Sequence, residues 1–242
     1  KASPDGTSKA EAEGRIQRVH GPPVVWKELR APFIQGVDNR NSYIGLAVAI
    51  VALLLMYLSA ARNRVLDENF THVSYVMLFL FIGVMVNVVF ASTRITTERE
   101  SQAWMLLLTT PLQDWEILLG KGFSAFRRCL PIWGFLAGHV LLFVLVRYIH
   151  PVAILHLLVL VTWVTCFLTA SGLYFSARFT RTTSAVVASF ALVLGLWAVA
   201  PVVTGLLGAL TEDMDLFRTY MWTHPVIQAE VIMSAAGGRQ HA

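Results

Sequence analysis

One apolar run distinguishes between the two kinds of fold that cross a lipid bilayer, the β-barrel and the helical bundle: Leu46-Ala-Val-Ala-Ile-Val-Ala-Leu-Leu-Leu-Met56. A strand of a transmembrane β-barrel would alternate apolar and polar residues over about ten positions. This run does not alternate, which excludes a barrel. A membrane-spanning helix needs about 20 predominantly apolar residues. The run and its flanks therefore predict a helix that crosses the membrane.

Four further stretches have the same character. Only 14% of the 242 residues are charged, against about 25% in an average soluble domain. Windows without Asp, Glu, Lys or Arg cover 41–61, 69–93, 129–146, 148–177 and 182–211. A soluble core would not need five such windows in succession. We predict an all-α polytopic membrane protein with spans at about 43–60, 73–91, 130–146, 152–175 and 184–207.

The basic residues predict the orientation, because short cytoplasmic loops are enriched in Lys and Arg. Fourteen of the nineteen Lys and Arg lie before the first span, between spans two and three, or between spans four and five. The other five are Arg62, Arg64, Arg147, Arg218 and Arg239. The N-terminus and the segment between spans two and three are therefore predicted to be cytoplasmic. The same bias explains the net charge of +4 without a nucleic-acid partner.

Two regions flank the spans on the N-terminal side. Residues 1–20 are polar, lack the apolar core of a signal peptide, and are expected to be a flexible cytoplasmic linker. Residues 22–33 predict a short interfacial helix, with Trp26 at the level of the lipid headgroups and Lys27 and Arg30 toward the phosphates. A solvated turn before the first span is the alternative.

The chain after the fourth span carries weaker signals. Pro201 is expected to kink or break span five because its ring removes one backbone hydrogen bond, and Gly205 and Gly208 add further weakness. Residues 211–242 are predicted to be external. Their mildly apolar stretch 226–236 is too short to span, so we expect a re-entrant or interfacial helix there.

The segment 95–121 between spans two and three is charged and amphipathic, which is unusual between long apolar runs. Thr97-Glu98-Arg99-Glu100 is typical of a capping box, in which the Thr97 hydroxyl and the Glu100 carboxylate satisfy backbone amides reciprocally. Trp104 then falls on an apolar face. Thr110-Pro111 predicts a second helix start, with Gln113 as the third helical residue. We expect two short amphipathic helices, with flexibility at Gly120 and Gly122 before span three.

The spans hold few groups that could do chemistry. They contain no Asp, Glu, Lys or Arg, which argues against proton- or sodium-coupled transport. His139 and His156 could face each other as a relay or a metal pair, although hydrogen bonds between helices are favoured for both. Asn87 is expected to bond to a neighbouring helix, and a role in transport is the alternative. Cys129 and Cys166 are interpreted as small buried apolar residues.

Catalytic motifs are also missing from the sequence. It has no phosphate-binding Gly-x-x-x-x-Gly-Lys-Ser/Thr loop and no His-Glu-x-x-His. It has no Gly-x-Ser-x-Gly either. We therefore expect no enzymatic activity and no bound cofactor or metal in this chain, and an energy source in a partner that docks on the segment 95–121.

At this point the chain resembles the integral membrane subunits of type-2 ABC exporters. The resemblance rests on Ile95-Thr-Thr-Glu98-Arg99-Glu100, on Leu106-Leu-Leu-Thr-Thr110-Pro111 and on Trp115-Glu116-Ile-Leu-Leu-Gly120-Lys121. Val24-Val25-Trp26-Lys27-Glu28-Leu29-Arg30 also resembles the interfacial helix before the first span of that family. The resemblance covers about residues 22–210.

The resemblance implies a permease domain over about 21–210, in the inner (plasma) membrane of a bacterium. It implies a second permease copy, in a homo- or heterodimer, and a separate ABC ATPase subunit that would hold the ATP and Mg²⁺. That subunit would dock on a coupling surface to which we assign Glu98, Arg99, Glu100, Trp104, Pro111, Asp114, Glu116 and Lys121. The family has six spans, so the full protein is expected to have a sixth after 211–242.

Two other functions stay open. One is a non-transporting membrane assembly or scaffold protein, whose cytoplasmic segment binds a partner. The other is an intramembrane enzyme, which the missing motifs disfavour. The spans carry neither charge nor unusual polarity, which favours an apolar or lipid-like cargo for a transporter.

Overall fold

A computed structural model describes residues 39–66, 68–103 and 113–237. In this part of the chain every regular element is a helix, and five segments are long and apolar enough to cross a membrane. The helices are α3 (Asn39–Arg62), α4 (Asn69–Ser92), α5 (Thr96–Glu100), α7 (Asp114–Leu145), α8 (Val152–Arg178), α9 (Thr182–Leu194), the π-helical turn η1 (Gly195–Val199), α10 (Ala200–Thr211), α11 (Asp215–Thr223) and α12 (Pro225–Gly237). The prediction of an all-α polytopic membrane protein is confirmed. The linker 1–20 and the interfacial helix 22–33 lie outside the described residues.

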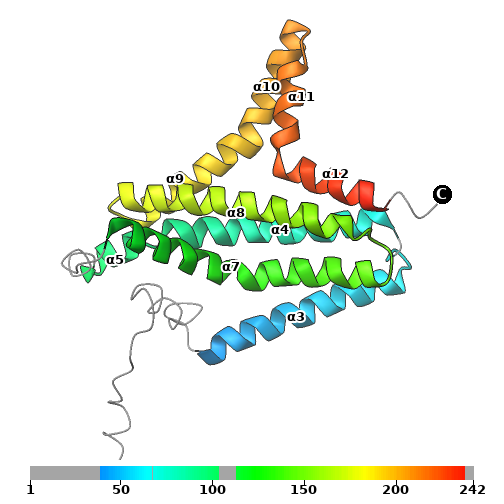
Figure 1. The fold of residues 1–242 in the computed structure, drawn as a ribbon, viewed down its shortest axis with the longest axis horizontal. Coiled ribbons are helices and arrows are strands. Elements are labelled where there is room, and N and C mark those ends of the chain that lie inside the picture. Colours follow the sequence, from blue (N-terminus) through cyan, green and yellow to red (C-terminus); the bar gives the residue numbers. More distant parts are fainter. Residues whose placement is uncertain (1–38, 67, 104–112, 238–242) are drawn as a thin grey trace, which may run out of the picture.

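The core of the molecule is a bundle of α4, α7 and α8, which run side by side (Figure 1). Small residues bring these helices together. Gly83 of α4 lies against the ring of Trp133 in α7, and Gly172 of α8 lies against Ala91 of α4. A Cβ atom added at Gly172 would lie 2.5 Å from that of Ala91. Helices in a membrane associate through such close approach, because lipid tails supply no hydrophobic force between them.

Helix α3 lies apart from this core and runs obliquely to it (Figure 1). Only 6% of its apolar window is buried, against 44% of the window that contains α4. Tyr57 makes its main polar contact, a hydrogen bond between the hydroxyl and Nδ1 of His139 in α7. The Tyr57 ring also stacks on Tyr75 of α4, with 4.8 Å between the ring centroids.

Helix α7 differs from its prediction. It is one helix of 32 residues, so the expected second amphipathic helix and span three are continuous. Gly120 and Gly122 do not interrupt it. Gly120 is buried, and a Cβ at Gly122 would meet Leu173 of α8 at an ordinary 3.5 Å. Packing against α8 therefore stabilises helical backbone where the sequence suggested flexibility. Pro131 also lies inside this helix.

The expected break in span five is the π-helical turn η1, which lies between α9 and α10. Pro201 has no N–H to give to the preceding turn. Two carbonyls in η1 find other partners: that of Leu196 accepts from the Tyr220 hydroxyl, and that of Trp197 accepts from Nε2 of His224, 2.9 Å away. The bend is thus hydrogen-bonded to the chain that returns from it.

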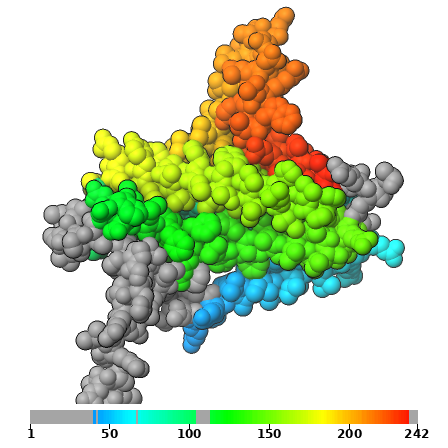
Figure 2. All heavy atoms as spheres, viewed as in Figure 1, coloured from blue at the N-terminus to red at the C-terminus, as the bar shows by residue number. Residues whose placement is uncertain are grey.

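Beyond this bend, α10 and α11 form a hairpin that projects from the bundle (Figures 1 and 2). Gly205 and Gly208 are points of close contact in it. A Cβ at Gly205 would lie 3.4 Å from the Phe217 ring, and one at Gly208 would lie 2.6 Å from Sδ of Met214. Both glycines lie inside the continuous helix α10, where the absence of a side chain lets the returning chain approach closely. The short helix expected at 226–236 is α12, which packs on α4 and α8 and buries Ala229 and Met233.

Candidate functional site

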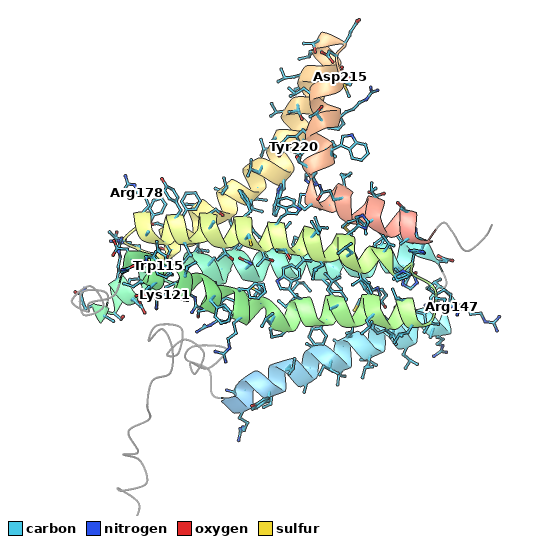
Figure 3. The ribbon with its side chains drawn as sticks, in the orientation of Figure 1. Trp115, Lys121, Arg147, Arg178, Asp215 and Tyr220 are labelled. Carbon is cyan, nitrogen blue, oxygen red and sulfur yellow. The ribbon has the colours of Figure 1, made fainter. Side chains whose placement is uncertain are left out.

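The segment singled out by sequence lies at one end of the bundle. Figure 3 labels Trp115, Lys121 and Arg178 at this end, here called the Lys121 end, and Arg147 at the opposite end, here called the Arg147 end. Of the assigned coupling residues, Trp104 and Pro111 lie outside the described residues. The other six fall into two groups, one facing the rest of the protein and one facing outward.

Glu98 and Lys121 belong to the inward group and pair with each other. Nζ of Lys121 donates to Oε1 of Glu98, which joins α5 to α7. Lys121 is only 3% exposed, although its helix carries it near the end of the bundle. A buried ammonium is costly unless it is paired, so this contact fixes the relative position of the two helices. The contact holds together the two sides of the segment 101–113.

Arg99 and Glu100 reach the chain between α8 and α9. Nη1 of Arg99 donates to the carbonyl of Phe179 at 3.3 Å, and the backbone N–H of Thr182 donates to Oε1 of Glu100 at 2.7 Å. Glu100 lies beyond the charge-free window of its span. The bond from the backbone N–H of Thr182 lowers the pKa of the Glu100 carboxyl, because it favours the charged form. Glu100 therefore satisfies an amide at the start of α9.

This geometry contradicts the capping box predicted at Thr97. The Thr97 hydroxyl donates to the carbonyl of Thr93 at 2.7 Å, and Glu100 bonds to α9 instead of reaching back. The physical reason is that only three residues separate α4 from α5. Backbone carbonyls of that turn accept from the first amides of α5, as Thr93 does from the N–H of Thr97 at 3.2 Å.

Ser176 of α8 was missed by sequence reasoning. Its fully buried hydroxyl oxygen accepts from the backbone N–H groups of Ile95 and Thr96, at 2.8 and 3.0 Å. The available signal was a small hydroxyl residue near the end of an apolar span, since such residues often join helices in membranes. We call three contacts together the polar junction: Glu98 with Lys121, Glu100 with Thr182, and Ser176 with Ile95 and Thr96.

The outward group lies at the start of α7. The helix begins at Asp114 with Gln113 as N-cap, and Gln113 forms a capping box with Glu116. Gln113, predicted as the third helical residue, is therefore the N-cap instead, and the predicted cap Thr110 lies outside the described residues. Asp114 is exposed and Trp115 is 56% exposed. We call these three residues, Asp114, Trp115 and Glu116, the exposed corner. It combines two acids at a helix N-terminus, where the helix dipole favours them, with a large apolar ring.

Buried basic groups lie beside the junction. The guanidinium groups of Arg94 and Arg128 lie over the Phe90 ring, at 5.9 and 5.6 Å from its centroid. Nη1 of Arg94 also donates to Oγ of Ser124 at 3.2 Å. Sequence reasoning used both arginines only to count charges. Their contacts join the end of α4 to α7, and they add to the ties at the Lys121 end.

The intramembrane histidines do not form the expected pair. His139 faces Tyr57 and His72, with 5.7 Å between the two imidazole centroids. His156 is exposed on α8, where its Nδ1 bonds to the carbonyl of Val152 at 3.0 Å. The hydrogen bond to Tyr57 confirms the favoured expectation of a bond between helices for His139, whereas that expectation is wrong for His156, which bonds within its own helix. Asn87 is also a link between helices, since the hydroxyl of Thr169 lies 3.4 Å from its Oδ1.

The two cysteines differ from each other. Cys129 is buried as expected, whereas Cys166 is exposed on the outer side of α8, so that interpretation is wrong for Cys166. Within the described part of the chain, no three His, Cys, Asp or Glu residues lie close enough to hold a metal ion.

Comparisons of the chain with protein-family models, with curated proteins and with solved structures found no match.

Proposed function

We propose that this chain is the membrane-spanning permease subunit of an ATP-driven exporter, with the Lys121 end in the cytoplasm. Its coupling surface would bind a separate ATPase subunit. The observation that carries the proposal is the polar junction. Its contacts tie the chain on both sides of 101–113 to each other and to neighbouring spans.

The junction gives a physical route from a soluble partner to the membrane. Glu98 and Lys121 join the α4–α5 side to α7, Ser176 joins it to α8, and Glu100 joins it to α9. Buried charges and amides are costly to separate from their partners. A displacement of the segment would therefore move four spans together, and ATP-driven closure of the partner would tilt them.

The exposed corner is the part of this surface that is free to contact a partner. Glu98, Arg99, Glu100 and Lys121 make contacts within the chain, and we assign them to transmission of the movement. Asp114 and Trp115 are exposed at the start of α7, and Glu116 beside them is half-buried. Exposed aromatic rings with adjacent charges are typical anchors in protein interfaces.

The second permease copy would lie against the spans with the least internal packing. Only 6% of the α3 window and 11% of the window from Thr182 to Thr211 are buried within one chain. We assign the translocation pathway to the interface between two copies that these spans would form.

The test is co-purification of the full-length protein with its candidate ATPase subunit, reading complex yield and ATPase rate. We expect Asp114→Lys/Trp115→Ala to abolish association. The control is Asp215→Lys/Leu216→Ala, which makes the same charge reversal and removes a large apolar side chain at the exposed start of α11, and it should leave association intact. If Asp114→Lys/Trp115→Ala leaves the association unchanged, the docking argument is overturned. Association without any change in ATPase rate would favour the scaffold function instead.

A further inference from the structure

A groove between α8 and α12 is the strongest feature that the proposed function does not use. One pocket of about 250 Å³ begins at His150, at the Arg147 end of the bundle. A second pocket of about 470 Å³ reaches Trp163, halfway along α8. Both are lined by His156, Val231 and Ile232, so they form one continuous groove. Figure 2 shows α12 lying along α8 where this groove is formed.

Hydrogen bonds join the two walls of the groove near each of its ends. At the Arg147 end, the backbone N–H of His150 donates to the carbonyl of Ala236 at 3.3 Å. At the other end, Nε1 of Trp163 donates to Oε1 of Gln228 at 3.2 Å. These bonds hold α12 at a fixed distance from α8. The groove is therefore a preformed feature of the fold.

Its length and lining match a single acyl chain. From Val152 to Trp163 the α8 wall is about 16 Å long at 1.5 Å per residue, which is close to half of the roughly 30 Å hydrocarbon core. The side chains between these limits are mostly aliphatic, among them Val159, Leu160 and Ile227. Such a groove takes one hydrocarbon tail from one leaflet.

The polar groups at the mouth indicate the headgroup. Nδ1 of His150 accepts from the backbone N–H of Val152, so the other ring nitrogen of neutral His150 is a donor. Nδ1 of His156 must donate to the Val152 carbonyl, so its other ring nitrogen is an acceptor. The mouth thus offers one donor and one acceptor. A protonated carboxyl group has the matching pair of functions, a C=O that accepts and an O–H that donates.

We infer that the groove between α8 and α12 binds a free fatty acid, with its chain between Val159 and Ile227 and its carboxyl group at His150 and His156. The site does not depend on an ATPase partner. This proposal and the proposed exporter function can therefore be tested independently of each other.

The test uses the full-length protein in phosphatidylcholine nanodiscs with a palmitic-acid analogue that carries a photoreactive diazirine near its methyl end. We expect adducts concentrated near Trp163 and Gln228. Val231→Trp fills the groove and should lower the adduct yield about fivefold, equivalent to roughly 1 kcal/mol of binding. Val226→Trp is the matched control on the same helix, because Val226 is equally exposed (43% against 45%) but does not line the groove.

A second variant and a second probe keep the test decisive if Val231→Trp does not fold. Ala235→Phe obstructs the groove near its mouth and should lower the yield as well. The methyl ester of the same probe should label these positions several-fold less than the acid. Equal labelling by acid and ester, or adducts spread evenly over the lipid-facing residues, would overturn the proposal in favour of ordinary bilayer lipid. If the groove residues are not labelled by the probe but can be crosslinked to another segment of the chain or to a second copy, the proposal is overturned in favour of that occupant.

Discussion

Helices α3 and α4 have nearly the same apolar character and opposite surroundings. Both contain a long charge-free window, yet 6% of one window and 44% of the other is buried within the chain. The difference lies in the small and polar residues. Helix α4 carries Gly83, Asn87 and Ala91 at its contacts with α7 and α8, whereas Gly45 of α3 has no neighbouring atom within 4 Å of a Cβ position. Hydropathy therefore predicts that a helix enters the bilayer, and small or polar residues decide what it packs against.

The largest effect should come from filling a close contact in the core. Gly172→Ala would place a methyl group against Ala91 and its backbone, and overpacking of this kind costs about 1–3 kcal/mol. Gly45→Ala in α3 meets open space, so we expect no loss of stability there. Thermal unfolding of both variants in detergent measures the contrast. Equal loss in the two variants would mean that α3 is packed as tightly as the core.

Ser176→Ala tests the polar contacts of the core next. It would leave two buried backbone N–H groups, of Ile95 and Thr96, without their acceptor, at a cost of about 2 kcal/mol. Ser171→Ala is the matched control in the same helix, because that hydroxyl bonds to the carbonyl of Leu168 within α8. Thermal unfolding midpoints measure the loss of stability in both variants. A control that loses as much stability as Ser176→Ala would remove the argument for a tie between helices.

The ion pair should give a smaller effect, since Glu98 keeps some contact with solvent. Glu98→Gln removes the carboxylate from Lys121 and is expected to cost about 1–2 kcal/mol. Lys121→Met in the same chain should recover part of this loss, because no buried ammonium then remains. A double-mutant cycle measures the coupling energy. A coupling energy near zero would show that the two groups act independently.

The smallest effect is expected at the hydrogen bond between Tyr57 of α3 and His139 of α7. Tyr57→Phe removes the hydrogen bond to His139, and bonds of this kind in a membrane contribute about 0.6 kcal/mol on average. Tyr43→Phe is the control, because Tyr43 is exposed on the same helix. Accessibility of single cysteines placed along α3 would report its detachment more directly than stability does. Unchanged accessibility in Tyr57→Phe would mean that ring stacking on Tyr75 is sufficient to hold α3 against the bundle.

The sequence predicts the spans well because membrane insertion depends on summed apolar character over about 20 residues. All five predicted spans are helices in the structure, and the break near Pro201 follows from a missing N–H. Helix ends were predicted less well. The start of α7 at Asp114 and the role of Thr97 depend on which backbone groups are already satisfied by neighbouring turns.

The sequence could not predict which polar side chains would pair with each other. Glu98 and Lys121 are 23 residues apart, and their pairing requires a particular rotation of α7 about its axis. His139 meets His72 and Tyr57 from two other helices for the same reason. Local patterns identify such residues as polar groups near or within spans. Only the packing of the helices determines which of them meet.

The sparse attachment of α3, through Leu53 and Tyr57 in its second half, has a consequence for bilayers of different thickness. A hydrophobic stretch that is too long for its membrane tilts at a modest energetic cost. The core helices cannot tilt separately, because Gly83 and Gly172 hold them in contact. Helix α3 is free to pivot about Tyr57, so we expect it to absorb hydrophobic mismatch while the shape of the core stays constant.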